Sequence, residues 1–288
     1  MSNLWKFSVA ISLSLVALFA SAKSSVWQVT KDGQTVYLGG TVHVLAQSDY
    51  PLPEEFDKAY DQSQILVFEM DMSATGTPQF QQAMMEKMMY TGGGTYADDL
   101  KPETVKRLDA YMAERNLPVD NLKVLKPSML SVTLSMLELQ RLGIFGAGVD
   151  LFYTQRGQAD NKSFAFLELP EEQLDFLAAL GKGYEDEFIN YTLDDISKIG
   201  DMMTEMKTAW RTGDSDALYN LGTKDWKQKF PQSYQSLIVD RNNNWMDDIE
   251  GYFSTKEVEF VLVGALHLVG DEGVLKQLED KGYKIIQL

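Results

Sequence analysis

The chain has 288 residues, of which 44% are hydrophobic and 24% are charged, so it can form one large globular domain or two modest ones. It contains no cysteine, which excludes disulfide scaffolds, thiol nucleophiles, iron–sulfur clusters and cysteine-ligated zinc sites. Forty-two acidic residues against 26 basic ones give a net charge of −16, and such a surface repels phosphate backbones, so we expect no nucleic-acid partner.

The N-terminal segment is typical of a secretory signal peptide. One lysine precedes an apolar run over residues 7–19, and the small residues of 20–22 suit a cleavage site. A retained membrane anchor is the alternative, but the run is shorter than the roughly 20 residues that span a bilayer. We therefore expect residues 1–22 to be removed and residues 23–288 to form a single domain. That domain would be periplasmic or secreted, with no stable membrane insertion.

The first predicted elements are strands and one helix. Strands at 27–29 and 35–38 flank an Asp-Gly pair, which is a strong signal for a hairpin. Proline and two glutamates at 53–55 open a helix that runs to about residue 62. The apolar run 65–68 then predicts a buried strand.

The middle of the chain is mainly helical, whereas the two ends alternate strands and helices. Helices are expected at 79–90, 102–115, 128–142 and over about 185–244, with one intervening strand at 163–167 and a helix opening at 170. A strand at 257–263, a helix at 272–279 and a strand at 283–287 end the chain. The sequence thus predicts an α/β fold with helical insertions at about 78–143 and 185–250.

Both histidines of the chain lie in the same kind of unit. The strand near 35–38 leads into Gly40-Thr-Val-His43, and the strand 257–263 leads into Gly264-Ala-Leu-His267. Each G-x-x-H motif is followed by a helix and another strand. We expect the glycine to permit a tight exit from the strand and the histidine to project over the carboxyl edge of the sheet, where open α/β sheets bind ligands.

Two glutamates are expected at the same edge, because Glu69 and Glu168 each end an apolar strand. Two imidazoles and two carboxylates above one sheet suit a divalent metal such as Mn, Co or Zn. Asp71 is a weaker candidate on the same strand face as Glu69. The alternatives are a histidine that is merely hydrogen-bonded at a core edge, and a Glu168 that complements the dipole of the next helix.

These residues together resemble the TraB/GumN family, whose animal relatives include the TIKI metalloproteases. The resemblance covers essentially the whole mature chain. The segments that carry it are Gly40–His43, Val67-Phe68-Glu69-Met70-Asp71, Gly148-Val-Asp150, Phe166-Leu167-Glu168, Arg241-Asn242, Gly264–His267, and Gly273-Val-Leu with Gly282-Tyr283.

The resemblance implies an EreA/ChaN-like central sheet built from two related β-GxxH-α-β units. It also implies a metal-dependent peptidase that uses Mn or Co, with His43 and His267 as the histidines of the two motifs and Glu69 as the glutamate of the site. Glu168, Arg241 and Asn242 match family positions.

The hypothesis is metal-assisted hydrolysis of a peptide or related acyl bond. His43, His267 and one glutamate would hold the metal, and the other glutamate would act as general base toward the bound water. Arg241 would stabilise the oxyanion or bind a substrate carboxylate, with Asn242 hydrogen-bonding nearby, unless Arg241 is only a surface charge. The motifs H-E-x-x-H and G-x-S-x-G are absent, which excludes a zincin and an ordinary serine hydrolase.

Two non-enzymatic functions remain as alternatives. Similarity to ChaN implies a protein that binds haem or a metal, with one histidine as axial ligand. The other alternative is a factor that binds peptides through its methionine- and aromatic-rich helical part.

Overall fold

The structure is a computed structural model that describes residues 23–288. The predicted signal peptide, residues 1–22, lies outside the described residues. Within the described part, no helix combines the length and the apolar character that a bilayer crossing requires.

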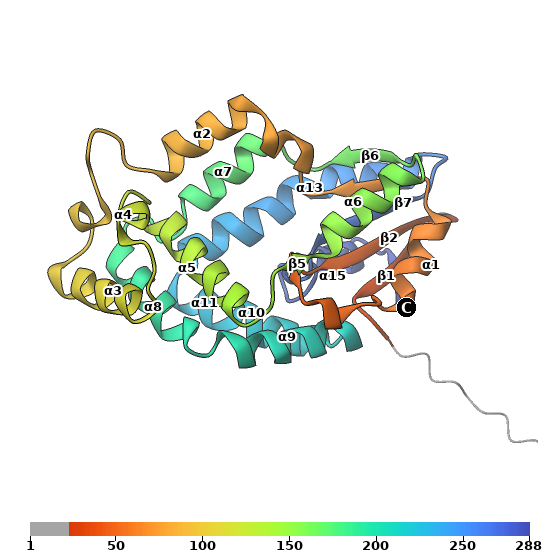
Figure 1. Ribbon diagram of the computed structural model, residues 1–288. Coiled ribbons are helices and arrows are strands. Elements are labelled where there is room, and N and C mark those ends of the chain that lie inside the picture. Colours follow the sequence, from red (N-terminus) through yellow and green to blue (C-terminus); the bar gives the residue numbers. More distant parts are fainter. Residues whose placement is uncertain (1–22) are drawn as a thin grey trace, which may run out of the picture.

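A six-stranded sheet forms the centre of one half of the molecule (Figure 1). Its strands are β1 (Val26–Lys31), β2 (Gln34–Thr41), β4 (Ile65–Phe68), β6 (Ser163–Phe166), β7 (Glu259–Gly264) and β8 (Lys284–Gln287). Their order across the sheet is β6-β4-β7-β2-β1-β8. The strands β6, β4, β7 and β2 pair in parallel, whereas β1 is antiparallel to both β2 and β8. The carboxyl ends of four parallel strands therefore meet at one edge.

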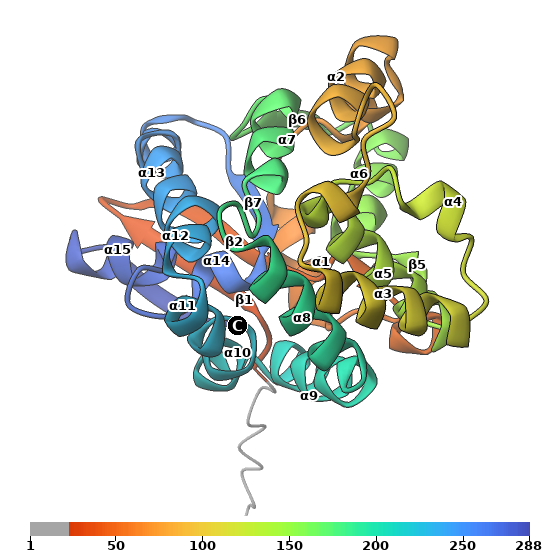
Figure 2. The same ribbon diagram turned by 90° about the vertical axis from the view of Figure 1, so that its left-hand side faces the viewer.

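Helices cover both faces of this sheet, with α1 and α6 on one side and α13 and α15 on the other (Figure 2). The bounds of these helices are α1 (Glu54–Gln62), α6 (Val149–Ala159), α13 (Arg241–Gly251) and α15 (Val274–Asp280), and the short helix α14 (Ala265–Leu268) follows β7 directly. The buried strand residues and these helices share one apolar core that includes the fully buried Phe56, Tyr153 and Phe260. We call the sheet with these five helices the sheet half.

A second group of helices packs around a core of its own, shown on the left of Figure 1. We call it the helical half. It consists of α3 (Pro102–Glu114), α4 (Val119–Leu122), α5 (Pro127–Arg141) and α8 (Glu185–Ile196), which share this core. It also includes α2 (Pro78–Met88) and α7 (Pro170–Ala178), which pack on each other around a smaller cluster of their own. Leu108, Leu130, Leu134 and Ile189 are fully buried in its core.

The connecting helices lead from the helical half back to the sheet. They are α9 (Ile199–Thr212), α10 (Ser215–Gly222), α11 (Lys224–Lys229) and α12 (Pro231–Tyr234), and a π-helical turn η4 (Gln235–Asp240) joins α12 to α13. Shorter elements are β3 (Val44–Leu45), β5 (Gly146–Ala147) and the 3₁₀ turns η1 (Gln47–Asp49), η2 (Met72–Gly76), η3 (Tyr96–Asp98) and η5 (Tyr252–Ser254). From α12 to α13 the chain forms one rod that runs between the two halves (Figure 1).

Most predicted elements are present, and the differences are local. The hairpin of 27–29 with 35–38 is confirmed as β1 and β2, and the helix 54–62 and strand 65–68 match α1 and β4. The helical region expected over about 185–244 is confirmed as the series of helices from α8 to α13, and α6 was not predicted. The α/β class is confirmed.

Candidate functional site

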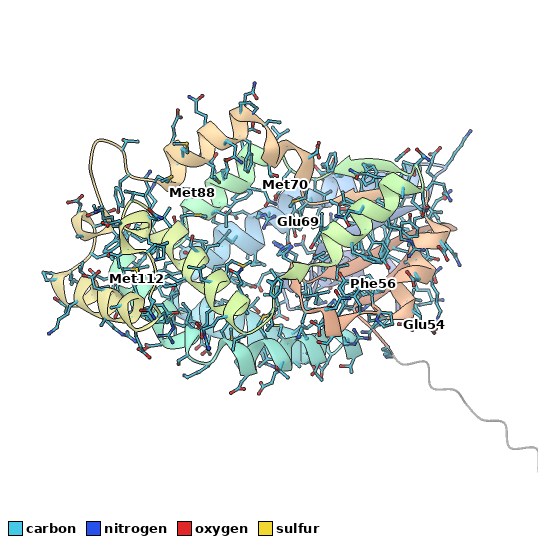
Figure 3. The ribbon with its side chains drawn as sticks, in the orientation of Figure 1. Glu54, Phe56, Glu69, Met70, Met88 and Met112 are labelled. Carbon is cyan, nitrogen blue, oxygen red and sulfur yellow. The ribbon has the colours of Figure 1, made fainter. Side chains whose placement is uncertain are left out.

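The carboxyl edge of the sheet gathers the predicted side chains from four strands. His43 follows β2, Glu69 follows β4, Glu168 follows β6, and His267 lies in α14 directly after β7. In Figure 3, Glu69 lies near the middle of the molecule, between the sheet and the helical half. The topology brings these residues together because all four strands are parallel and end at the same edge.

Arg241, the first residue of α13, is the centre of the cluster. It is only 7% exposed, so it is not a surface charge. Its Nε and one terminal nitrogen donate to the two oxygens of Glu168 at 2.7 and 2.8 Å. The same terminal nitrogen donates to Oε2 of Glu69 at 2.5 Å. One guanidinium therefore holds both strand-end carboxylates, each of which is 9% exposed.

Glu168 has donors on both of its oxygens besides Arg241. The indole Nε1 of Trp245 donates to its Oε1 at 2.8 Å, and the amide of Gln173 donates to its Oε2 at 2.9 Å. Gln173 also reaches Oε2 of Glu69 at 3.1 Å. Each Glu168 oxygen thus accepts two hydrogen bonds, which fixes the carboxylate and leaves it no free lone pair.

His267 is held in one tautomer by its neighbours. Its Nδ1 lies 2.7 Å from Oδ1 of Asn242, whose own amide donates to the backbone carbonyl of His267 at 3.1 Å. Its Nε2 lies 3.1 Å from a terminal nitrogen of Arg241, and because arginine is only a donor, this Nε2 must accept. Nδ1 therefore carries the proton and Nε2 carries the lone pair that faces the cluster.

His43 is oriented by Asp150 in the first turn of α6. Its Nδ1 donates to a carboxylate oxygen of Asp150 at 2.9 Å. Gly148 lies so close to the His43 backbone carbonyl that a Cβ at this position would be 2.2 Å from the oxygen, so only glycine lets α6 begin here. Nδ1 is therefore engaged, and Nε2 is the nitrogen that His43 presents to the other site residues.

Gly264 marks the point where three of these side chains meet. A Cβ placed on it would lie 3.3 Å from Oε1 of Glu69, 3.5 Å from Cδ2 of His267 and 3.8 Å from Nε2 of His43. Its backbone N–H donates to Oε1 of Glu69 at 2.7 Å. A larger residue at this position would fill the space that the two imidazoles and the carboxylate share.

Burial and charge set different protonation states across the site. Burial would raise the pKa of Glu69, but Arg241, the two imidazoles and the N–H of Gly264 outweigh it and hold that pKa well below its usual value. Burial lowers the pKa of His267 to about 3, so this ring is neutral. The Asp150 carboxylate raises the pKa of His43. An ionised carboxylate and a neutral imidazole therefore face each other beside Arg241.

The donor set has the chemistry of a divalent-metal site. Two imidazole Nε2 atoms face the same space as an ionised carboxylate, and the Nδ1 atom of each ring is hydrogen-bonded to an oxygen, as is usual for metal-bound histidine. Among the described residues, however, no three histidine, aspartate or glutamate side chains are arranged to hold an ion as they stand. Arg241 donates to the Nε2 lone pair of His267, which it must release before this ring could ligate.

A comparison with protein-family models identifies the TraB/PrgY/gumN family, with a match over residues 25–287. The chain belongs to the TraB/PrgY/gumN family. No curated protein and no solved structure matches it with significant similarity. The family resemblance seen in the motifs is confirmed, and its match covers nearly the whole chain described above.

Three residues of this TraB/PrgY/gumN chain lie in the cluster without having been assigned a role from sequence. They are Asp150, Gln173 and Trp245. Asp150 belongs to the Gly148-Val-Asp150 segment of the family pattern, and Trp245 follows Arg241 by four residues, so it lies on the same helix face. Gln173 lies in the first turns of α7, and its sequence context gave no signal.

The predicted position of Asp71 is wrong. It was expected on the same strand face as Glu69, but β4 ends at Phe68 and the chain then turns. Asp71 is the N-cap of the 3₁₀ turn η2, where its carboxylate accepts from the backbone N–H of Ser73 at 2.8 Å. It is a capping residue outside the cluster.

The reason for glycine in the two motifs also differs from the expectation. Neither Gly40 nor Gly264 has a positive φ, so neither serves a left-handed turn at the strand end. A Cβ on Gly40 would lie 3.0 Å from both Cα and Cβ of Ala265, in the second motif. Glycine is needed at position 40 because the two motifs approach each other closely, whereas at position 264 it leaves the space beside Glu69 open.

Proposed function

We propose that this protein is an exported metal-dependent hydrolase, similar to the TIKI metallopeptidases, that acts on peptide bonds. The observation that carries the proposal is the arrangement of the two histidines. Each has its Nδ1 hydrogen-bonded to a side-chain oxygen. The Nε2 of His43 lies near the same point as Oε1 of Glu69, and the Nε2 of His267 faces Arg241, which also holds Glu69. Family membership supports the same reading, including an EreA/ChaN-like arrangement of the sheet.

In this proposal His43, His267 and Glu69 would hold a divalent ion such as Mn, Co or Zn. The ion, when bound, would lower the pKa of a water molecule and so supply the nucleophile. Glu69 suits ligation because its depressed pKa keeps it ionised at neutral pH.

Arg241 and Glu168 have supporting roles in the same proposal. Glu168 is saturated with hydrogen bonds, so it is better suited to orient Arg241 than to accept a proton as general base. Arg241 brings a fixed positive charge to the place where a carbonyl oxygen gains negative charge, which favours the transition state. Asn242 keeps His267 in the tautomer that exposes Nε2.

The test is metal analysis of the mature protein after loading with Mn, Co or Zn and removal of excess ion. We expect about one ion per chain, lost in His43→Ala, His267→Ala and Glu69→Gln. Glu54→Gln is the matched control, because 77% of the Glu54 side-chain area is exposed far from the cluster. Hydrolysis of unstructured peptides, abolished by a chelator and restored by the ion, then tests the reaction itself.

Two results would overturn the proposal. One is a metal content at background under every loading condition. The other is a Soret band on addition of haem that disappears in a single histidine variant, which would favour the haem-binding alternative.

A further inference from the structure

A cavity of about 350 Å³ lies where the helical half, the connecting helices and α14 meet. Its walls come from α5, α8, α9, α10 and α11 and from the residues after α7. The apolar side chains that matter for the argument are Leu180, Tyr191, Met202, Met206, Trp226 and Leu266. All six are only partly buried, so α8, α9, α11, α14 and the segment after α7 leave apolar surface facing a shared space.

Two of the hydroxyl groups on the wall are already hydrogen-bonded within the protein. The hydroxyls of Ser131 and Thr192 are hydrogen-bonded to each other at 2.6 Å, and Thr192 also donates to the backbone carbonyl of Phe188 at 2.9 Å. Asp195 is the one charged residue among those that line the space. Burial of an apolar group is therefore the main favourable interaction that this cavity offers.

The cavity borders the element that carries the second histidine, because one of its lining residues belongs to the second G-x-x-H motif. Leu266 lines the cavity, and His267 is the next residue in the same turn, α14. The helix α10 packs directly on Leu266, since a Cβ on Gly222 would lie 2.5 Å from its side chain. A group seated in the cavity is thus next to the element that positions His267.

We propose that this cavity receives a large apolar side chain of a peptide substrate, adjacent to the bond that the site hydrolyses. The proposal rests on the proposed peptidase function. A volume of about 350 Å³ is at the lower end of ligand pockets, which suits one aromatic or long aliphatic side chain. Met202 and Met206 form a flexible wall that adapts to several such shapes.

The first test is binding without hydrolysis, which does not depend on any catalytic activity. The mature protein is labelled with ¹³C at its methionine methyl groups and titrated with N-acetylphenylalaninamide or N-acetylaspartic acid amide. We expect the signals of Met202 and Met206 to shift with the phenylalanine probe and not with the aspartic acid probe. Trp226→Ala should abolish the shift. Met206→Gln should reduce the affinity for the phenylalanine probe at least tenfold.

Met85→Gln is the matched control, because Met85 is 56% exposed on α2 and does not line the cavity. Circular dichroism and the unshifted methyl signals report whether each variant is folded. Equal shifts with both probes, or no shift at Met202 and Met206 in the folded wild type, would overturn the proposal.

The second test separates the subsite from the reaction. If peptide mixtures are cleaved, we expect cuts next to large apolar residues, preferred by about 10- to 200-fold over polar ones. Met206→Gln should weaken that preference, whereas Met85→Gln should keep it. Cleavage without such a preference overturns the subsite and leaves the hydrolase intact. If the probe binds but no peptide is cleaved, the proposal of an apolar side-chain site stands and the proposed hydrolase function is overturned.

Discussion

The two sides of the carboxyl edge are built in opposite ways. On the sheet side, Arg241, Glu69 and Glu168 are each less than 10% exposed, and every one of them is hydrogen-bonded. On the side of the helical half, Met202 and Met206 face a cavity that holds a single charged lining residue. The first arrangement fixes charges in one geometry, and the second leaves flexible apolar side chains with room to move.

The charged cluster is therefore the rigid side of this edge, and the cavity is the adaptable side. A buried guanidinium with two carboxylates is stable only when every partner is present, so that region tolerates little change. A methionine-lined cavity loses only contact area when one side chain is altered. Substitutions on the two sides should therefore differ in how much unfolding free energy they remove and in which binding property they change.

The largest loss of stability is expected for Arg241→Met, which removes the centre of the charged cluster on the sheet side. Removing the guanidinium leaves Glu69 and Glu168 buried without their positive partner, which costs about 3–5 kcal/mol of unfolding free energy. Urea unfolding measures the loss. The control is Arg107→Met, because Arg107 pairs with Asp194 at the surface and should contribute less than about 1 kcal/mol. Equal losses in both variants would contradict the comparison.

Leu134→Ala tests whether the helical half is a separate core. Leu134 is fully buried there, so truncation should cost about 2–5 kcal/mol. Hydrogen exchange should show the loss first in α3, α5 and α8, with the strands of the sheet still protected. Uniform loss of protection across β2 and β7 would mean that the two cores unfold as one.

Asp150→Asn tests the sheet side at its more exposed end, where His43 lies. The variant removes the carboxylate that orients His43 and favours its Nδ1–H. We expect metal affinity to fall about 10- to 100-fold, measured by titration with Mn or Zn, with little change in stability. Asp120→Asn is the control, since 90% of its side-chain area is exposed. An unchanged affinity would remove Asp150 from the supporting residues of the site.

The smallest effect concerns Glu138 in the helical half. Its hydrogen bonds from Arg141 and Arg115, opposed by burial, lower its pKa below the ordinary 4.5. Its contribution is therefore present above about pH 4.5 and is lost as the pH falls through the folded-state pKa. Stability curves of the wild type and Glu138→Gln should differ by about 1 kcal/mol at pH 7 and converge at lower pH. A difference that grows toward acid would show the opposite sign.

Local patterns predicted the strand ends well. The Asp-Gly hairpin, the apolar run before Glu69 and the two G-x-x-H motifs depend on neighbouring residues, and the structure places all of them as expected. The helix α6 was missed because its apolar and polar residues do not separate into faces. The region 185–244 was predicted as helical without the bounds of its separate helices. One of those bounds is set by Gly213, whose left-handed conformation ends α9.

The interior of the cluster could not be derived from spacing. Arg241 is 73 residues from Glu168 and 172 from Glu69, and only the folded chain shows that one guanidinium contacts both. Family resemblance pointed to Arg241, but not to its role as the centre. Residues 1–22, the metal and the substrate stay predictions.

The position of β7 in the middle of the sheet has a consequence for how the chain is made. β7 lies between β2 and β4, yet it spans Glu259–Gly264 of 288 residues. Until residues 259–267 are synthesised, β2 and β4 each lack the strand that joins them, and the site has neither His267 nor Gly264. Such pairings between distant segments form slowly and leave strand edges exposed in the meantime. The chain must therefore be available through His267 before either the sheet or the cluster can assemble.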